Sequence, residues 1–225
     1  MNTNIFKLIM AIIAMFFVVA TSTAQETKTM YIMKNGAVIR KVSVSDIDSL
    51  IFRNLDDIEI NGVVWATRNV GTPGTFVDKP EDAGMFYQWN RSKGWAATGY
   101  YVSGWDSSIP TGTTWETANN VCPAGYRVPT DVEIQSLMNS YSRWTTQNGV
   151  DGYVFGRGGN TIFLPAAGWR YSGNGTLFDA GSSCNYWSST PNGNDYAFSL
   201  DYNSNYERKS STIRSIGLSV RCVAE

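Results

Sequence analysis

Beyond residue 150 the sequence alternates short apolar and aromatic runs with clusters of Gly and Asn, and this punctuation constrains the fold more than any other feature. Gly and Asn tolerate the backbone conformations of tight turns, and short runs between such clusters are typical of β-strands. No tandem repeat at the spacing of a solenoid or a propeller accompanies the pattern. We therefore expect strands at five places: 152–156, 161–168, 185–190, 195–202 and 215–223.

Two Asn-Gly pairs lie earlier in the chain, at 35–36 and 61–62, each between alternating apolar residues. Asn-Gly is the strongest short-range signal of a two-residue hairpin turn. We predict hairpins over 29–44 and 57–70, with a brief helical turn in 45–52. Because a hairpin of two strands is only marginally stable alone, the first should either dock on its neighbour or associate with another molecule.

Two capping boxes predict helices in the middle of the chain. Thr113 with Glu116 opens a helix over 114–121, and Thr130 with Glu133 opens a helix over 131–142. In such a box the hydroxyl and the carboxylate each accept a hydrogen bond from an otherwise unpaired backbone N–H. The second helix has apolar side chains at helical spacing, which predict a buried face: Ile134, Leu137, Met138 and Tyr141.

The N-terminus has the pattern of an export signal. Lys7 precedes an apolar run over 8–20, and small residues in 21–24 fit a cleavage site before Gln25. A membrane anchor is the alternative, but this run of 13 apolar residues is shorter than the roughly 20 that span a bilayer. We expect a signal peptide over 1–24, a hairpin segment over 25–56 and one domain over 57–225, exported to the periplasm, the cell surface or the medium without a membrane span after cleavage.

Composition argues against two classes of function. The net charge is −1 and charged residues make up 16% of the chain, so no basic face is expected for nucleic acid. The chain has no His, the usual proton shuttle and the commonest metal ligand. We expect neither an enzyme nor a cofactor. Three Cys in an exported chain indicate one disulfide and one further thiol.

Residues 114–137 (TWETANNVCPAGYRVPTDVEIQSL) resemble the matching stretch of C-type-lectin-like domains. With four further motifs, the resemblance points to one family within this fold. The chain over roughly 57–225 is similar to the Fibrobacter succinogenes major paralogous domain, a family of exported bacterial proteins. The opening 30–52 also resembles a leader of secreted proteins from gut Bacteroidetes. The four motifs are INGVVWATRNVG (60–71), IFLPAAGWR (162–170), YWSST (186–190) and GLSVRCV (217–223).

The resemblance implies an α+β fold: a C-type-lectin-like domain with two helices, a small twisted antiparallel sheet and long loops, here preceded by the N-terminal β-hairpin. It also implies a disulfide between Cys122 and Cys222, which leaves Cys184 unpaired. The calcium-binding motifs of sugar-binding C-type lectins are missing, so we expect no metal site. The catalytic relative, of the formylglycine-generating type, needs reactive Cys or metal chemistry, and we assign no catalytic residue.

About half of the residues from 171 to 212 are Tyr, Asn, Ser or Asp, the mixture that antibody paratopes use. The segment resembles the variable region of proteins diversified by bacterial retroelements, whereas solvation of long loops is the alternative explanation. We predict an adhesion or binding module whose partner is a protein or a glycan. Exposed Trp side chains would stack on the sugar rings of a glycan. A structural subunit of a surface filament is the second hypothesis. The predicted ligand-binding residues are Tyr171, Asn174, Asn185, Asn192, Asn194, Tyr196, Asp201, Tyr202, Asn203, Asn205 and Tyr206.

Overall fold

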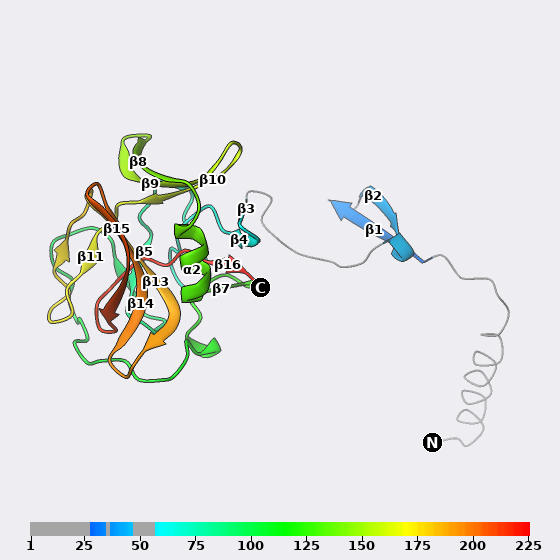
Figure 1. Ribbon diagram of the computed structural model, residues 1–225. Coiled ribbons are helices and arrows are strands. Elements are labelled where there is room, and N and C mark those ends of the chain that lie inside the picture. The colour runs from blue at the N-terminus through cyan, green and yellow to red at the C-terminus, as the bar shows by residue number, and fades with distance from the viewer. Residues whose placement is uncertain (1–27, 35–36, 47–56) are drawn as a thin grey trace, which may run out of the picture. The chain divides into compact units, whose positions relative to one another are not determined.

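The computed structural model describes residues 28–34, 37–46 and 57–225. The chain divides into two compact units, residues 1–51 and 52–225 (Figure 1). None of the helices within the described ranges has the length and hydrophobicity needed to cross a membrane. The predicted signal peptide (1–24), the Asn-Gly turn at 35–36 and most of the turn predicted in 45–52 lie outside these ranges.

In the first unit, β1 (Thr29–Lys34) and β2 (Ala37–Ser43) pair as an antiparallel hairpin. A short 3-10 turn, η2 (Val44–Asp46), follows directly. The strands of the first predicted hairpin are therefore confirmed.

The second unit contains several small antiparallel sheets, and one of them joins its beginning to its end. β4 lies between β3 and β16 in this sheet, so the first and last strands of the unit are held together. The predicted turn at 61–62 is confirmed, because Asn61 and Gly62 have the positive φ angles, 52° and 80°, that a tight hairpin turn requires. The four strands are β3 (Ile58–Ile60), β4 (Val63–Trp65), β16 (Val223–Ala224) and β7 (Tyr126–Arg127).

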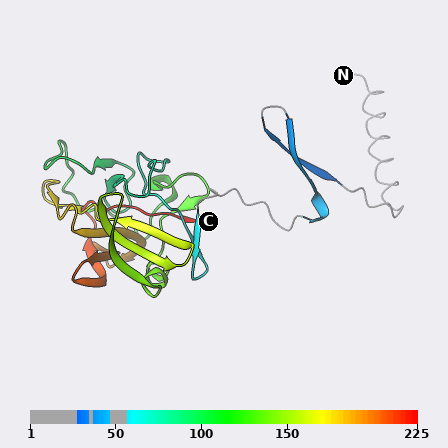
Figure 2. The same cartoon turned by 90° about the horizontal axis from the view of Figure 1, so that it is seen from above.

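Two three-stranded sheets form most of the rest. The β8–β9–β10 sheet lies above the β13–β14–β15 sheet in Figure 1 and in front of it in Figure 2, which shows the unit from above. The first has β8 (Ser142–Gln147), β9 (Val150–Arg157) and β10 (Asn160–Pro165). The second has β13 (Ser183–Asn192), β14 (Tyr196–Asn203) and β15 (Tyr206–Ile213). Two-stranded sheets pair β5 (Met85–Tyr87) with β6 (Gly94–Ala96) and β11 (Trp169–Arg170) with β12 (Leu177–Phe178).

The helix α2 (Asp131–Met138) begins where the second capping box predicted. The Oγ1 atom of Thr130 accepts from the backbone of Glu133, and the Glu133 carboxylate accepts from the backbone of Thr130. Ile134 and Leu137 are buried. The predicted helix is confirmed, and so is its buried face for Ile134, Leu137 and the partly buried Met138. The prediction is wrong for Tyr141, which is exposed, because the helix ends at Met138, where Ser140 bonds back to the Leu137 carbonyl and β8 begins at Ser142.

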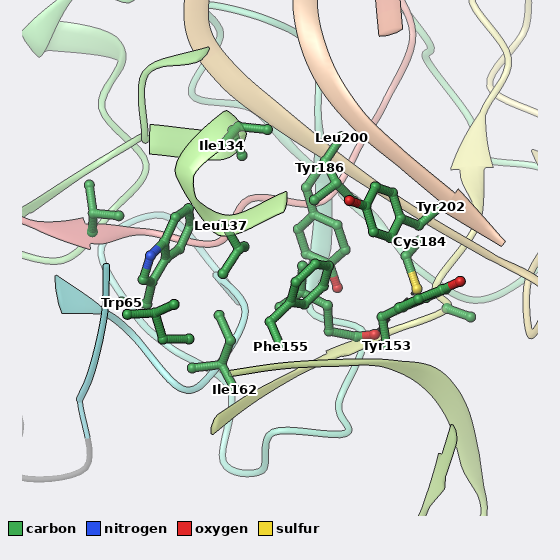
Figure 3. Packing of buried hydrophobic residues seen from close by; sticks show 14 residues of the cluster. Trp65, Ile134, Leu137, Tyr153, Phe155, Ile162, Cys184, Tyr186, Leu200 and Tyr202 are labelled. Atoms are coloured by element: carbon green, nitrogen blue, oxygen red, sulfur yellow. Dashed lines mark hydrogen bonds between the residues drawn. The ribbon is translucent and has the colours of Figure 1, made fainter. Parts of the chain in front are cut away.

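The helix packs its buried face on an aromatic core between the two three-stranded sheets (Figure 3). Apolar side chains of β13 and β14 lie on one side, and side chains of β9 and β10 lie on the other. Burial of such large side chains is the main source of stability in a unit with so little helix. The labelled members are Trp65, Ile134, Leu137, Tyr153, Phe155, Ile162, Cys184, Tyr186, Leu200 and Tyr202.

The expectation of an α+β fold with two helices is wrong. Residues 114–121 form only a 3-10 turn, η3 (Thr117–Asn119), and the Thr113–Glu116 capping box is absent, since Glu116 has no side-chain capping bond. Asparagine side chains accept here from backbone N–H groups that the capping box and the helix would otherwise use. Asn90 Oδ1 accepts from the backbone N–H of Glu116, and Asn120 Oδ1 accepts from that of Cys122. Such bonds between side chains and the backbone compete with a short helix, whose nucleation is costly.

The expectation of a single small sheet is wrong as well, because the strands of the second unit form several separate sheets. Among the longer strands, β8 and β15 were not predicted, and neither were the two-residue strands β7, β11 and β12. β15 is largely polar, and it is a strand because it pairs along its whole length with β14. The predicted strand over 215–223 is reduced to β16 and isolated bridges such as that between Tyr186 and Ser219.

Cys122 and Cys222 form the disulfide that the resemblance implied, across a separation of 100 residues. Both lie in a second buried cluster, with Trp89 and Trp187. Cys184 is free and buried. The disulfide thus ties η3 and the loop after it to the C-terminal segment of the unit.

Candidate functional site

The β13–β14–β15 sheet has one face on the aromatic core, and its other face is polar near the β14–β15 turn. Leu200 and Tyr202 of β14 point into the aromatic core (Figure 3). Asp201 lies between them in sequence and therefore faces the other way. It is paired in register with Asn185 of β13 and with Arg208 of β15. These three residues form one cross-strand row on the polar face.

Asp201 is the centre of this row. Its Oδ1 atom accepts from Asn185 Nδ2 at 3.0 Å and from the Tyr206 hydroxyl at 3.2 Å. Its Oδ2 atom accepts from Nε and Nη2 of Arg208, at 2.8 and 2.7 Å, and from Ser210 Oγ at 3.2 Å. The nearly buried carboxylate is therefore both neutralised and fully hydrogen-bonded, as a buried charge must be.

A cavity of about 220 Å³ lies over the polar face. The sheet supplies its hydrogen-bonding groups, while Trp169 of β11 and the segment after β15 supply apolar walls. We call it the Trp169 cavity. Its lining residues are Trp169, Asp179, Ser183, Asn185, Asp201, Tyr206, Arg208, Thr212, Ile216 and Leu218.

Local structure fixes the indole ring of Trp169. It is paired across β11–β12 with Phe178, and the two rings stack with centroids 5.0 Å apart. Its Nε1 atom donates to Asp179 Oδ2 at 2.8 Å. Gly168 permits the close approach of the chain after β12, because a Cβ there would lie 2.1 Å from the Phe178 carbonyl oxygen. The ring therefore has a defined position at the edge of the cavity.

Electrostatics keep the donors of the site protonated. The hydrogen bonds to Asp201 raise the pKa of Arg208. Burial, together with the negative charge of Asp201, raises the pKa of Tyr206. The cavity thus presents amide, hydroxyl and guanidinium groups beside an aromatic ring, which suits recognition of a polar, hydroxyl-bearing group. Within the described ranges, no group of three His, Cys, Asp or Glu side chains could hold a metal ion.

The predicted ligand-binding residues do not form one surface. Asn185, Asp201 and Tyr206 line the Trp169 cavity. Asn203 and Asn205 lie in the β14–β15 turn beside it, where Asn203 Oδ1 accepts from the backbone N–H groups of Asn205 and Tyr206. Five of the predicted residues are therefore brought together at this end of the sheet.

The other six do not line the cavity. Asn192, Asn194 and Tyr196 lie around the β13–β14 turn at the other end of β14. Tyr171 and Asn174 lie in the loop between β11 and β12. Tyr202 is 1% exposed and packs against Tyr153 and Phe155. A ligand at the surface would not reach it.

Sequence reasoning left Trp169 and Arg208 out of the predicted site. Arg208 could have been found if β15 had been recognised, since a two-residue turn after Asn203 places it opposite Asp201. Four Trp lie in or beside predicted loops and could stack on a sugar, namely Trp95, Trp105, Trp144 and Trp169. Of the four, Trp95 is buried against Trp105, and Trp144 packs against Tyr153.

Two larger hollows, of about 440 and 480 Å³, share Tyr141, Gly156 and Arg157. Most of their lining side chains are exposed. They lack the buried, hydrogen-bonded row of the Trp169 cavity, which is therefore the stronger candidate for a specific ligand site.

Comparison with known proteins finds a match to one family model, which covers less than half of the chain and names no function. Residues 141–223 match the model of a domain of unknown function, DUF8237. This match covers β8 to the start of β16 and so includes every residue that lines the Trp169 cavity. No curated protein and no solved structure matches the chain. The resemblance to the Fibrobacter succinogenes family stays a prediction, whereas the fold that it implied has been corrected above.

Proposed function

We propose that this chain is an exported ligand-binding or adhesion module and that its ligand binds in the Trp169 cavity. The observation that carries the proposal is the row of Asn185, Asp201 and Arg208 beside Trp169. Hydrogen-bonding groups that are already held in place lose little entropy when a ligand binds. An aromatic wall next to them supplies contact area with few rotatable bonds.

Its partner is a protein or a glycan at the cell surface, as the Tyr-rich and Asn-rich composition of this region suggests. Export rests on the N-terminal sequence alone. The ion pair between Arg208 and Asp201 orients the side chains of the site. It is not expected to provide much binding affinity by itself, because the Arg208 side chain is 59% exposed.

The test is a binding screen of the mature chain, residues 25–225, on an array that carries glycans and immobilised extracellular proteins. We expect at least one class of probe to bind. Binding should be lost in Trp169→Ala and in Arg208→Ala. Tyr141→Ala is the matched control, because Tyr141 is an aromatic residue 45% exposed that lines other hollows. A ligand that binds all four proteins equally would place the site elsewhere, and an array without any bound probe would contradict the proposal.

The hairpin of the first unit favours a second candidate, a structural role in a surface assembly. Tyr31 and Ile39 on its strands are 53% and 60% exposed. A two-stranded sheet has free edges that another strand can extend. Size-exclusion chromatography of the mature chain with and without residues 25–56 tests this role. Oligomers that depend on concentration and disappear on truncation would favour assembly, and a monomer in both cases would favour a free-standing binder.

A further inference from the structure

Two exposed aromatic rings continue from Trp169 across the surface. Phe178 stacks on Trp169, and Tyr171 contacts Phe178 edge-on with centroids 6.3 Å apart. Tyr171 is 46% exposed and Phe178 is 40% exposed. We call Trp169, Phe178 and Tyr171 the aromatic strip. Its first member lines the Trp169 cavity, so the strip and the cavity are continuous.

A buried arginine holds the loop that carries the strip. Arg170 is fully buried, and its guanidinium donates to the carbonyl of Gly175 at 2.6 Å. The same group donates to the carbonyls of Ala96, Thr98 and Gly99 at 2.8 to 3.0 Å. It thereby ties residues 169–178 to residues 96–99. Four bonds from one planar group leave this loop little freedom.

The rings themselves are also positioned. Trp105 Nε1 donates to the Ser172 carbonyl at 2.8 Å, in the residue after Tyr171. Gly173 lies close beneath the Tyr171 ring, since a Cβ there would come within 2.8 Å of Cε1. An exposed aromatic surface that is rigid before binding is typical of a contact surface, because its burial costs little conformational entropy.

The charges around the cavity indicate which ligands fit. Asp201 and Arg208 neutralise each other, and Asp179 adds one negative charge at the rim. The remaining negative charge would repel an anionic ligand. The hydroxyl groups of a ligand, in contrast, can both donate hydrogen bonds to the side chains of the cavity and accept hydrogen bonds from them. Sugars combine hydroxyl edges with apolar C–H faces that stack on aromatic rings.

We propose that the ligand is an uncharged oligosaccharide, with one sugar unit in the Trp169 cavity and the following units along Phe178 and Tyr171. This inference rests on the proposed function and specifies its ligand. It differs from a single-sugar site in one measurable way: affinity should increase with the number of sugar units until the strip is covered.

The test is titration calorimetry of the mature chain with glucose, mannose and xylose and with their neutral oligosaccharides of two to six units. We expect at least one series in which the dissociation constant falls about tenfold from one unit to three, as one or two added stacking contacts would give. In Tyr171→Ala this gain should disappear while affinity for the single sugar is kept. Tyr171→Phe should keep the gain, because the ring and not the hydroxyl makes the contact.

Trp169→Ala should lose binding of every length, and Tyr141→Ala, the exposed control, should behave as wild type. Thermal unfolding of each variant verifies that it folds. Sugar binding that does not depend on length, or that Tyr171→Ala leaves unchanged, would overturn the strip and leave the cavity as the site. If no sugar binds but an array protein binds through Trp169, the ligand class is wrong and the proposed function stands. If neither binds, both fail.

Discussion

Arg208 donates two hydrogen bonds to one oxygen of Asp201, from Nε at 2.8 Å and from Nη2 at 2.7 Å. The two partners differ in burial, since the Arg208 side chain is 59% exposed and that of Asp201 is 11% exposed. The carboxylate also accepts from three other side chains, those of Asn185, Tyr206 and Ser210. Asp201, rather than Arg208, therefore holds the polar face together.

This difference predicts unequal costs for the two alanine variants. Asp201→Ala leaves several donors without an acceptor and should lower the free energy of unfolding by about 3 kcal/mol. Arg208→Ala removes an exposed partner from a carboxylate that keeps three other bonds, and should cost about 1 kcal/mol or less. Urea unfolding measures both. Equal costs, or the opposite order, would show that the exposed guanidinium is the more important partner.

The hydrogen bonds of Arg170 predict a large loss of stability even for a substitution that keeps the positive charge. Arg170→Lys should lower the free energy of unfolding by about 3 kcal/mol, because an ammonium group cannot replace four directed bonds to buried carbonyls. Arg157→Lys is the control: Arg157 is exposed, lies over the Tyr141 ring with 4.6 Å from Cζ to the centroid, and should change stability by about 0.5 kcal/mol or less. Chemical denaturation of both proteins makes the comparison. Similar small losses in the two variants would mean that water replaces the bonds of Arg170.

The features that the sequence predicted well are those set by neighbours along the chain. The capping box of Thr130 and Glu133 involves residues three apart, and the turn at Asn61-Gly62 needs only two positive φ angles. The first helix did not form where its capping box was predicted, because the backbone N–H of Glu116 donates to Asn90, 26 residues earlier, and not to the hydroxyl of Thr113. Such a competitor is not visible in a local pattern.

The site was predicted only in part, because some of its residues come together through contacts that are distant in sequence. Composition pointed to Asn185, Asp201 and Tyr206, but the same composition also selected Tyr202, whose side chain alternates into the core. The decision between the two faces depends on strand register. Trp169 joins the site through contacts of β11 and β12, which are two residues long and give no periodic signal.

Cys184 should be inert in the folded protein. It is fully buried, and burial raises the pKa of its thiol to about 12, so that the reactive thiolate is scarce near neutral pH. Mass spectrometry after iodoacetamide treatment should find no adduct on the native protein and one adduct after unfolding without reductant. Unfolding with reductant should give three adducts, because the chain has three Cys, two of them in the Cys122–Cys222 disulfide. An adduct on the native protein would reveal that the core opens around Cys184.

The carboxyl group of Glu133 is expected to contribute to the free energy of unfolding in a way that depends on pH. Burial acts to raise the pKa of its carboxyl group, but the hydrogen bonds from Arg127 and Thr130 outweigh it, and the pKa is lowered. A lowered folded pKa means that the ionised form stabilises the fold. This stabilisation is complete above the ordinary pKa of glutamate, 4.5, and is lost as the pH falls through the lower folded value.

Glu133→Gln should therefore be less stable than wild type by about 1 kcal/mol at pH 7, because the amide keeps the shape of the capping box without its charge. The difference should shrink as the pH falls below 4.5. Glu116→Gln is the matched control, since the corresponding capping box did not form and Glu116 is exposed; its stability should follow wild type at every pH. Thermal unfolding from pH 7 to pH 3 measures both variants. A gap for Glu133→Gln that stays constant with pH would mean that packing, and not charge, makes Glu133 important.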